Sequence, residues 1–345
     1  MEITKNSGSV IQQILFDHLK NSTIGNTSLI DTLSDLLNIS TDGVYRRMRG
    51  EKLLDLGELI KICLHFRVSI DGIMGINKQA LQFNYTPLDL SNLGMYKRYM
   101  TQLLQSFSDL SKVEDKEVFL TAVDIPMFHF LPFTELTLFK VFSYSNSTGA
   151  FQGKYGEFCK LIKDDELINI YKQLTMSYNV IPSVEIWTEG TFDAILRSID
   201  YYFESGYFSS ADEALMLCSQ LLDMVTNINK IADRGFKDHL SSKIPYKLYL
   251  CDIELENNFV IMRRGQTISC IVKLYTVNSM ATSNPDFCNE SMKWINNTMK
   301  KSILISGGSQ KESFKFFNLL NQKIRYLIEK IESSSNLFNL ANPPY

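Results

Sequence analysis

Basic side chains gather between residues 40 and 52, where Arg46, Arg47, Arg49 and Lys52 follow one another closely. On a helix these four positive charges would lie within about two turns. An arginine guanidinium can donate two parallel hydrogen bonds to guanine O6 and N7 or to a phosphate, and a lysine ammonium pairs with phosphate as a point charge. The spacing therefore favours contact with a nucleic-acid backbone and with base edges.

The residues around these charges suit the same chemistry. Ser40 and Thr41 can donate to phosphate, and Tyr45 can contact a phosphate or a thymine methyl group. Asp42 acts in two directions, because it favours the positive end of a helix and can accept from cytosine N4 but repels phosphate. Gly43 costs a helix about 1 kcal/mol relative to alanine, which a close approach to DNA would explain. The candidate DNA-binding residues are Ser40, Thr41, Asp42, Gly43, Tyr45, Arg46, Arg49 and Lys52.

Two short helices joined by a tight turn are expected to hold these side chains. The first helix ends at Asn38, a residue type that enters the left-handed conformation at low cost. Ile39 packs the turn into the core, and Ser40 is a favourable N-cap for a second helix that starts at Thr41. The inward residues are Leu33, Leu36 and Leu37 on the first helix and Val44 and Met48 on the second.

The stretch from Leu33 to Gly50, L-S-D-L-L-N-I-S-T-D-G-V-Y-R-R-M-R-G, resembles the helix-turn-helix of the Cro and lambda-repressor type, the xenobiotic-response-element family of bacterial regulators. The family pattern reads roughly L-A-x-x-L-G-V-S-x-x-T-V-S-x-x-E-x-G. This sequence has Ser34 for the alanine, Asn38 for the turn glycine, Gly43 for the threonine, Tyr45 for the serine and Met48 for the glutamate. The resemblance implies that the second helix reads base edges in the major groove, at the positions of Thr41, Asp42, Gly43, Tyr45 and Arg46.

The resemblance covers about the first 75 residues and implies a five-helix domain over residues 1–80. An amphipathic helix is expected over residues 9–20, with Val10, Ile14, Leu15 and Leu19 on one face. The stretch from Leu53 to Gly75 continues the family's pattern with an amphipathic helix and then a last short helix. Residues 45–50 are also similar to a bacterial subgroup of these regulators that has a long C-terminal part of unknown role.

The charge is spread unevenly, although the net charge is only −3. Residues 1–75 carry 8 basic and 9 acidic side chains, residues 76–235 carry 13 and 20, and residues 236–345 carry 14 and 9. A nearly neutral DNA-binding domain departs from the usual basic footprint. Phosphate contact depends on the local patch, so the sequence predicts DNA binding with a weak non-specific component.

Several classes of protein find no support in the sequence. No apolar run approaches the roughly 18 residues that span a bilayer, and the N-terminus lacks a signal segment, so a cytoplasmic protein without membrane contact is expected. The six cysteines have no C-x-x-C spacing, which favours reduced thiols over a zinc site. No recognisable catalytic motif is present. We therefore expect no enzyme activity, no cofactor and no metal.

Residues 81–235 are expected to form a helical bundle that links or dimerises the protein. An apolar seam over residues 92–111 alternates intervals of three and four, as in a short coiled coil, or else it is the inner face of a core helix. The aromatic cluster at Phe128–Phe142 either forms core or lines an apolar ligand pocket. Residues 118–125 are expected to form a strand or an extended entry into Pro126, and further helices are expected at about 134–144, 157–178, 189–205 and 210–233. The candidate dimerisation residues are Leu93, Tyr96, Met100, Leu103, Phe107 and Leu110.

Residues 236–332 are expected to form an α+β module that senses a ligand or partner. Three β-rich runs, Tyr246–Leu255, Phe259–Arg264 and Thr267–Val277, are joined by short connections that predict an antiparallel meander. Helices at about 285–300 and 310–332 flank a short strand at 302–306. Residues 333–345, rich in serine, asparagine and proline, are expected to form a loose tail.

The sequence thus predicts a multi-domain, mainly α chain with a helix-turn-helix domain, a central helical bundle and a C-terminal α+β module. The expected function is transcription regulation by a homodimer on an inverted-repeat operator in double-stranded DNA. The size of the remainder leaves room for sensing a small-molecule or protein effector. The alternative is a non-DNA-binding interaction scaffold that retains the helix-turn-helix fold. Neither the operator nor the direction of regulation follows from the sequence.

Overall fold

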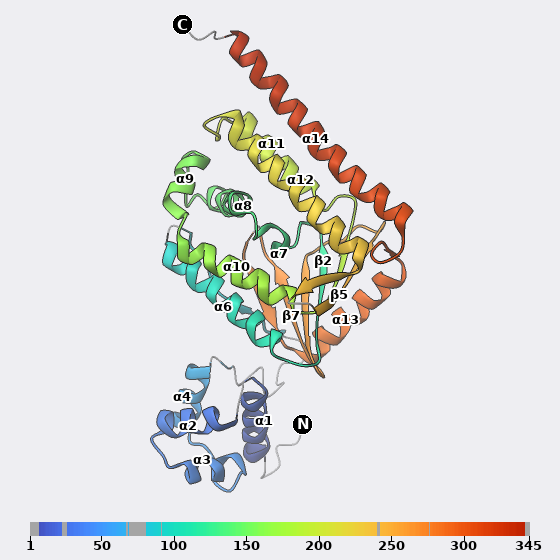
Figure 1. Cartoon of the computed structure of the whole chain (residues 1–345). Coiled ribbons are helices and arrows are strands. Elements are labelled where there is room, and N and C mark those ends of the chain that lie inside the picture. The colour runs from blue at the N-terminus through green and yellow to red at the C-terminus, as the bar shows by residue number, and fades with distance from the viewer. Residues whose placement is uncertain are drawn as a thin grey trace. The chain divides into compact units, whose positions relative to one another are not determined.

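The computed structural model describes residues 7–22, 26–66, 68, 81–90, 92–239, 242–275 and 277–341. The chain divides into two compact units, Met1–Gln82 and Phe83–Tyr345 (Figure 1). The described part of the first unit contains the helices α1 (Ser7–Ser22), α2 (Asn26–Leu37), α3 (Thr41–Met48) and α4 (Leu56–Phe66). The expected fifth helix lies outside the described residues.

The core of the N-terminal unit is formed by apolar side chains of all four helices. Leu33 and Val44 are almost completely buried, as their spacing predicted. The opening helix is rotated from its predicted face, since Val10 and Ile14 are exposed while Phe16 is buried. The buried core residues are Leu15, Phe16, Leu19, Leu29, Leu33, Leu37, Val44 and Ile62.

The turn between α2 and α3 has the predicted conformation. Asn38 has a φ of 53°, in the left-handed region. The amide of Ile39 donates to the carbonyl of Ser34 at 3.1 Å, which closes the end of α2. The Ser40 hydroxyl accepts from the amide of Gly43 at 3.2 Å and caps α3. The sequence therefore encodes the start of α3 locally.

The second unit is built on one mixed β-sheet in which nine strands are described. Its strands are β1 (Asn84–Tyr85), β2 (Lys116–Ala122), β3 (Ser183–Trp187), β4 (Phe236–His239), β5 (Ser242–Leu250), β6 (Phe259–Arg264), β7 (Thr267–Lys273), β8 (Ser279–Thr282) and β9 (Ile303–Leu304). The order is β1-β8-β7-β6-β2-β3-β5-β4, and β9 pairs with β5. Strands β2, β3 and β5 are mutually parallel, and the other pairings are antiparallel.

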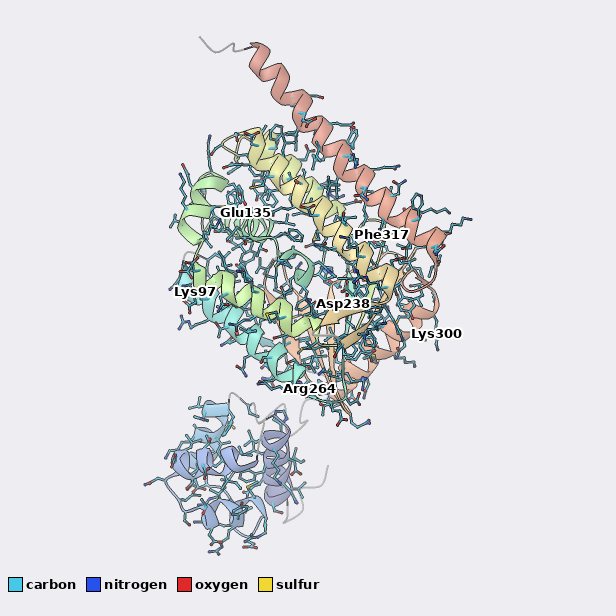
Figure 2. The ribbon with its side chains drawn as sticks, viewed as in Figure 1. Lys97, Glu135, Asp238, Arg264, Lys300 and Phe317 are labelled. Carbon is cyan, nitrogen blue, oxygen red and sulfur yellow. The ribbon has the colours of Figure 1, made fainter. Side chains whose placement is uncertain are left out.

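Helices cover both faces of this sheet (Figure 1). Alternate residues of β2 point to opposite faces, so that Val118 and Leu120 join a large helical core while Phe119 packs in a smaller core with α13 (Pro285–Lys300). The other helices are α6 (Leu93–Ser111), α7 (Met127–Phe130), α8 (Thr134–Ser147), α9 (Tyr155–Ile162), α10 (Asp165–Asn179), α11 (Asp193–Glu204), α12 (Ala211–Arg234) and α14 (Gln310–Ala341). The long α14 packs along α12, and its Phe317 is buried (Figure 2).

The predicted fold class is wrong for this second unit, which is a mixed α/β structure. Strands β2 and β3 come from the region expected to be a helical bundle, and they pair with strands from the region expected to be a separate module. The predicted first strand of the meander corresponds to β5, but in the sheet β5 lies next to β3 and not next to β6. Buried strands lack the alternating pattern that marks an exposed meander, and all five residues of β3 are buried.

The apolar seam of α6 packs inside the unit, which is the core-helix alternative. Tyr96, Met100, Phe107 and Leu110 are buried, and Leu93 and Leu103 pack against the same core. The hydroxyls of Tyr96 and Tyr171 lie 2.9 Å apart across α6 and α10. Lys97 on α6 forms ion pairs of 2.8 Å with Asp164 and Glu166 at the start of α10 (Figure 2). This face of α6 is therefore not available to a second copy of the chain in this conformation.

Two further expectations changed at the level of single elements. The aromatic cluster divides, since Phe139 and Phe142 are core while Phe128 and Phe130 also line a cavity. Helix α14 continues to Ala341 and does not end near Glu332, so residues 333–341 of the expected loose tail are helical. Residues 342–345 lie outside the described residues.

Candidate functional site

The candidate DNA-binding residues gather on one open side of α3 and in the loop after it. Val44 is buried and Met48 half-buried, while the residues at the other side face solvent. The exposed residues of the helix and its C-cap cover an arc of roughly 140° at 100° per residue. They are Thr41, Asp42, Tyr45, Arg46 and Arg49. Gly43 is half-buried, and the exposed members of the set are Ser40, Thr41, Asp42, Tyr45, Arg46, Arg49 and Lys52.

Arg47 does not belong to this surface, although the sequence counts it in the basic patch. Its side chain is only 5% exposed and forms an ion pair with Glu58 of α4. Arg47 Nε donates to Glu58 Oε2 at 3.0 Å, and Arg47 Nη1 donates to the carbonyl of Gly43 at 3.1 Å. The guanidinium therefore ties α3 to α4, and the exposed patch retains three of its four positive charges.

Arg46 and Arg49 both face the carboxylate of Glu51. Arg49 Nε lies 2.6 Å from Glu51 Oε1, and Arg46 Nε lies 3.7 Å from Glu51 Oε2. The hydrogen bond from Arg49 lowers the pKa of Glu51, so this carboxylate is charged at neutral pH. Exposed pairs of this kind contribute little to stability, so phosphate oxygens can replace the carboxylate. In the free protein, however, Glu51 weakens the positive field of the surface.

Gln12 on α1 positions the C-terminal end of α3, and the sequence reading did not find it. Its amide nitrogen donates to the carbonyls of Arg47 and Lys52, at 2.7 and 2.8 Å. Its amide oxygen accepts from the backbone amide of Leu54 at 2.7 Å. Gln12 is buried beside Leu15, and a polar residue on the buried face of an amphipathic helix was the signal available. The three bonds fix the segment that carries Arg49 and Lys52.

A second polar cluster is buried between the sheet and the helices of the second unit. Glu185 on β3 has no exposed surface, and His129 Nε2 lies 2.9 Å from both of its carboxylate oxygens. The carboxylate also accepts from the Tyr178 hydroxyl at 2.5 Å and from Trp187 Nε1 at 2.7 Å. The sequence offered no partner for His129, because Glu185 lies 56 positions away. These saturated contacts join β3 to α7 and α10, which is a structural role.

Comparisons with protein families, with characterised proteins and with solved structures find no match to this chain. Within the described residues, no helix has the length and apolar character needed to cross a membrane. The same residues contain no group of three His, Cys, Asp or Glu side chains placed to hold a metal ion. The geometry of α3 and its surroundings is therefore the main indication of function.

Gly43→Ala is expected to stabilise the N-terminal unit by about 1 kcal/mol, because alanine favours a helix interior. An added Cβ would meet Ile39 and Ser40 at ordinary contact distances of 3.5 Å. Hydrogen exchange of the buried amides of α2 measures the stabilisation. If glycine serves a close approach to DNA, duplex binding weakens in the same variant. Unchanged affinity together with higher stability would remove Gly43 from the DNA-binding set.

Proposed function

We propose that the chain is a cytoplasmic DNA-binding transcriptional regulator whose α3 enters the major groove of duplex DNA. The observation that carries this proposal is the helix pair α2–α3, joined by the left-handed Asn38 and presenting an exposed outer side on α3. A helix of this kind with Arg46 and Arg49 exposed can contact base edges and phosphates together.

The proposal includes a homodimer on an inverted repeat, since helix-turn-helix proteins bind two half-sites one DNA turn apart. The seam of α6 is buried in its own unit, so a dimer would use another surface. The second unit is larger than dimerisation alone requires. We therefore assign to it, besides dimerisation, the sensing of a small-molecule or protein effector. Sedimentation of the chain with and without duplex DNA tests the stoichiometry.

The alternative is an interaction scaffold that keeps the helix-turn-helix fold without binding DNA. Two features favour it: the nearly balanced charge of residues 1–75 and the pairing of Glu51 with Arg46 and Arg49. Both features lower the attraction of the surface for a polyanion. They do not remove the hydrogen-bonding groups that read bases, so we retain the regulator as the first proposal.

A mobility-shift experiment with Arg46→Ala separates the two functions. Arg46 is exposed on the proposed surface, and its loss is expected to lower specific affinity by about 1–3 kcal/mol, or roughly 5- to 150-fold. Lys61→Ala on α4 removes the same charge from an exposed position of the same unit and serves as the control. Equal effects of the two substitutions would mean that α3 does not read bases.

Glu51→Gln is expected to strengthen non-specific binding to duplex DNA. The substitution frees Arg49 and Arg46 from their shared carboxylate, and one more phosphate contact steepens the plot of log Kobs against log salt by about one. Fluorescence anisotropy over a salt series measures this slope. Asp17→Asn on α1 makes the same change in net charge at another exposed position. An equal slope in that control would show that total charge governs binding and that the Glu51 pairing is irrelevant.

A further inference from the structure

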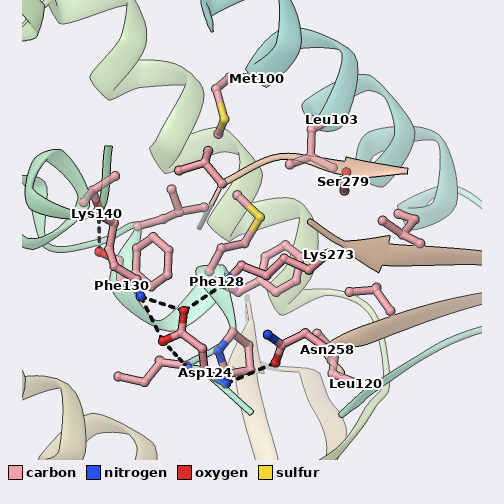
Figure 3. A pocket seen from close by; sticks show the side chains of 18 of the residues that line it. Met100, Leu103, Leu120, Asp124, Phe128, Phe130, Lys140, Asn258, Lys273 and Ser279 are labelled. Atoms are coloured by element: carbon pink, nitrogen blue, oxygen red, sulfur yellow. Dashed lines mark hydrogen bonds and ion pairs between the residues drawn. The ribbon is translucent and has the colours of Figure 1, made fainter. Parts of the chain in front are cut away.

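A cavity of about 100 Å³ lies in the second unit, next to the C-terminal end of β2 (Figure 3). The side chains of Met100, Leu103 and Phe107 on α6 line it from one side, and Leu120 of the sheet and Phe128 line it from others. Strand β2 has a parallel neighbour in β3 and an antiparallel neighbour in β6. The carboxyl ends of parallel strands are where open α/β sheets commonly bind ligands.

Three charged side chains form one end of this otherwise apolar cavity. Asp124, which follows β2, lies 2.6 Å from the ammonium group of Lys140 on α8 and 2.9 Å from that of Lys273 at the end of β7. The exposed fractions of the Asp124, Lys140 and Lys273 side chains are 13%, 7% and 21%. In Figure 3 dashed lines join Asp124 to the ammonium nitrogens at one end of the cavity. Met100 and Leu103 lie at the opposite end.

Asp124, Lys140 and Lys273 together carry a net charge of +1 when all three side chains are ionised. Burial alone raises the pKa of Asp124, but the charges of Lys140 and Lys273 lower it well below its ordinary value, so the carboxylate is ionised. One carboxylate faces two lysines, and no second carboxylate forms an ion pair with either lysine among the described residues. An uncompensated charge against an apolar wall is costly unless an anion joins it.

We propose that this cavity binds a small amphipathic monoanion, a carboxylate with a short aliphatic body. The ligand carboxylate meets Lys273 and Lys140, and its apolar body lies among Met100, Leu103 and Phe128. A cavity of 150 Å³ accommodates benzene, which has six non-hydrogen atoms, so one of about 100 Å³ takes a ligand of roughly four or five. As the assignment of an effector this inference rests on the proposed function, whereas binding itself requires no DNA.

Calorimetry of the 345-residue chain without DNA tests the site, with propionate as the probe and propan-1-ol and propylamine as matched controls. Propionate is expected to bind about tenfold more tightly than either control, because it alone brings a negative charge to the two ammonium groups. Equal binding of propionate and propan-1-ol, or no binding of propionate, would overturn the proposal. This comparison needs no variant.

Lys273→Met removes the surplus charge and leaves the pair between Asp124 and Lys140 in place. It is expected to weaken propionate binding about tenfold and to leave propan-1-ol unaffected. Lys315→Met, at an exposed position of α14, is the control. Unchanged propionate affinity in a folded Lys273→Met variant would overturn the assignment. If propionate binds while no duplex is bound, the site stands and the regulator function fails; DNA binding without propionate binding gives the reverse.

Discussion

Arg47→Met is expected to lower the free energy of unfolding of the N-terminal unit by about 1–3 kcal/mol, because it leaves the half-buried carboxylate of Glu58 and the carbonyl of Gly43 without their buried partner. The Glu58 side chain is 14% exposed, and the hydrogen bond from Arg47 is the main cause that lowers its pKa. The neighbouring Arg46→Ala is expected to change this stability by less than about 0.5 kcal/mol, since Arg46 is exposed. Hydrogen exchange of buried amides in α2 and α4 measures both effects.

A double variant separates structure from recognition. Arg47→Met with Glu58→Leu replaces both charges by apolar groups, which is often neutral for stability. The double variant should therefore regain most of the lost stability and bind duplex DNA nearly as the wild type does. A folded double variant that has lost specific DNA binding would contradict the structural role assigned to Arg47.

The same pair gives a pH dependence. The pKa of Glu58 is lower in the folded state than its ordinary value of 4.5, so the contribution of the pair is fully present above that pH. It is lost as the pH falls through the lowered folded value. The wild-type unit should lose this contribution in acid, whereas the double variant has no such carboxylate to protonate.

Glu185→Gln is expected to destabilise the second unit by about 1–3 kcal/mol, because an amide group replaces one of two carboxylate oxygens that accept buried hydrogen bonds. Glu185 is completely buried and accepts hydrogen bonds from His129, Tyr178 and Trp187. Unfolding in denaturant, followed by tryptophan fluorescence, measures the loss. Glu189→Gln, just beyond β3 and exposed, should cost less than about 0.5 kcal/mol. Similar losses in the two variants would contradict the role given to Glu185.

The acid sensitivity of the second unit should follow Glu185. Burial raises the pKa of its carboxyl, but the His129 charge and the hydrogen bonds outweigh burial and lower it. A lowered folded pKa gives stability that is present above the ordinary value of 4.5 and lost as the pH falls. The Glu185→Gln variant lacks this group, so its stability should vary less with pH in that range.

The turn before α3 could be predicted from sequence because its determinants are local. Asn38 takes the left-handed conformation, Ser40 caps the helix and Val44 packs inward, as the residue types and spacing indicated. The role of Arg47 could not be predicted in this way. Its partner Glu58 lies on another helix. In the sequence Arg47 stands between Arg46 and Arg49, and nothing local shows that its side chain alone of the three is buried.

The second unit was harder to predict because its contacts are distant in sequence. The spacing on α6 identified an apolar face correctly, but it could not say whether α10 or a second copy covers that face. Strand β3 is short and buried on both sides, so it lacks the alternation that identifies strands. The cavity cluster joins Asp124 to Lys273, 149 positions further along the chain, which no local pattern announces.

The most direct test of the central claim is selection of duplexes from a random pool by the folded 345-residue chain. A regulator that places α3 in the major groove should enrich an inverted repeat whose half-sites lie about 34 Å apart, one helical turn of DNA. The Arg46→Ala variant should bind the selected duplex more weakly than Lys61→Ala does. A folded chain that enriches no duplex would contradict the proposed DNA binding.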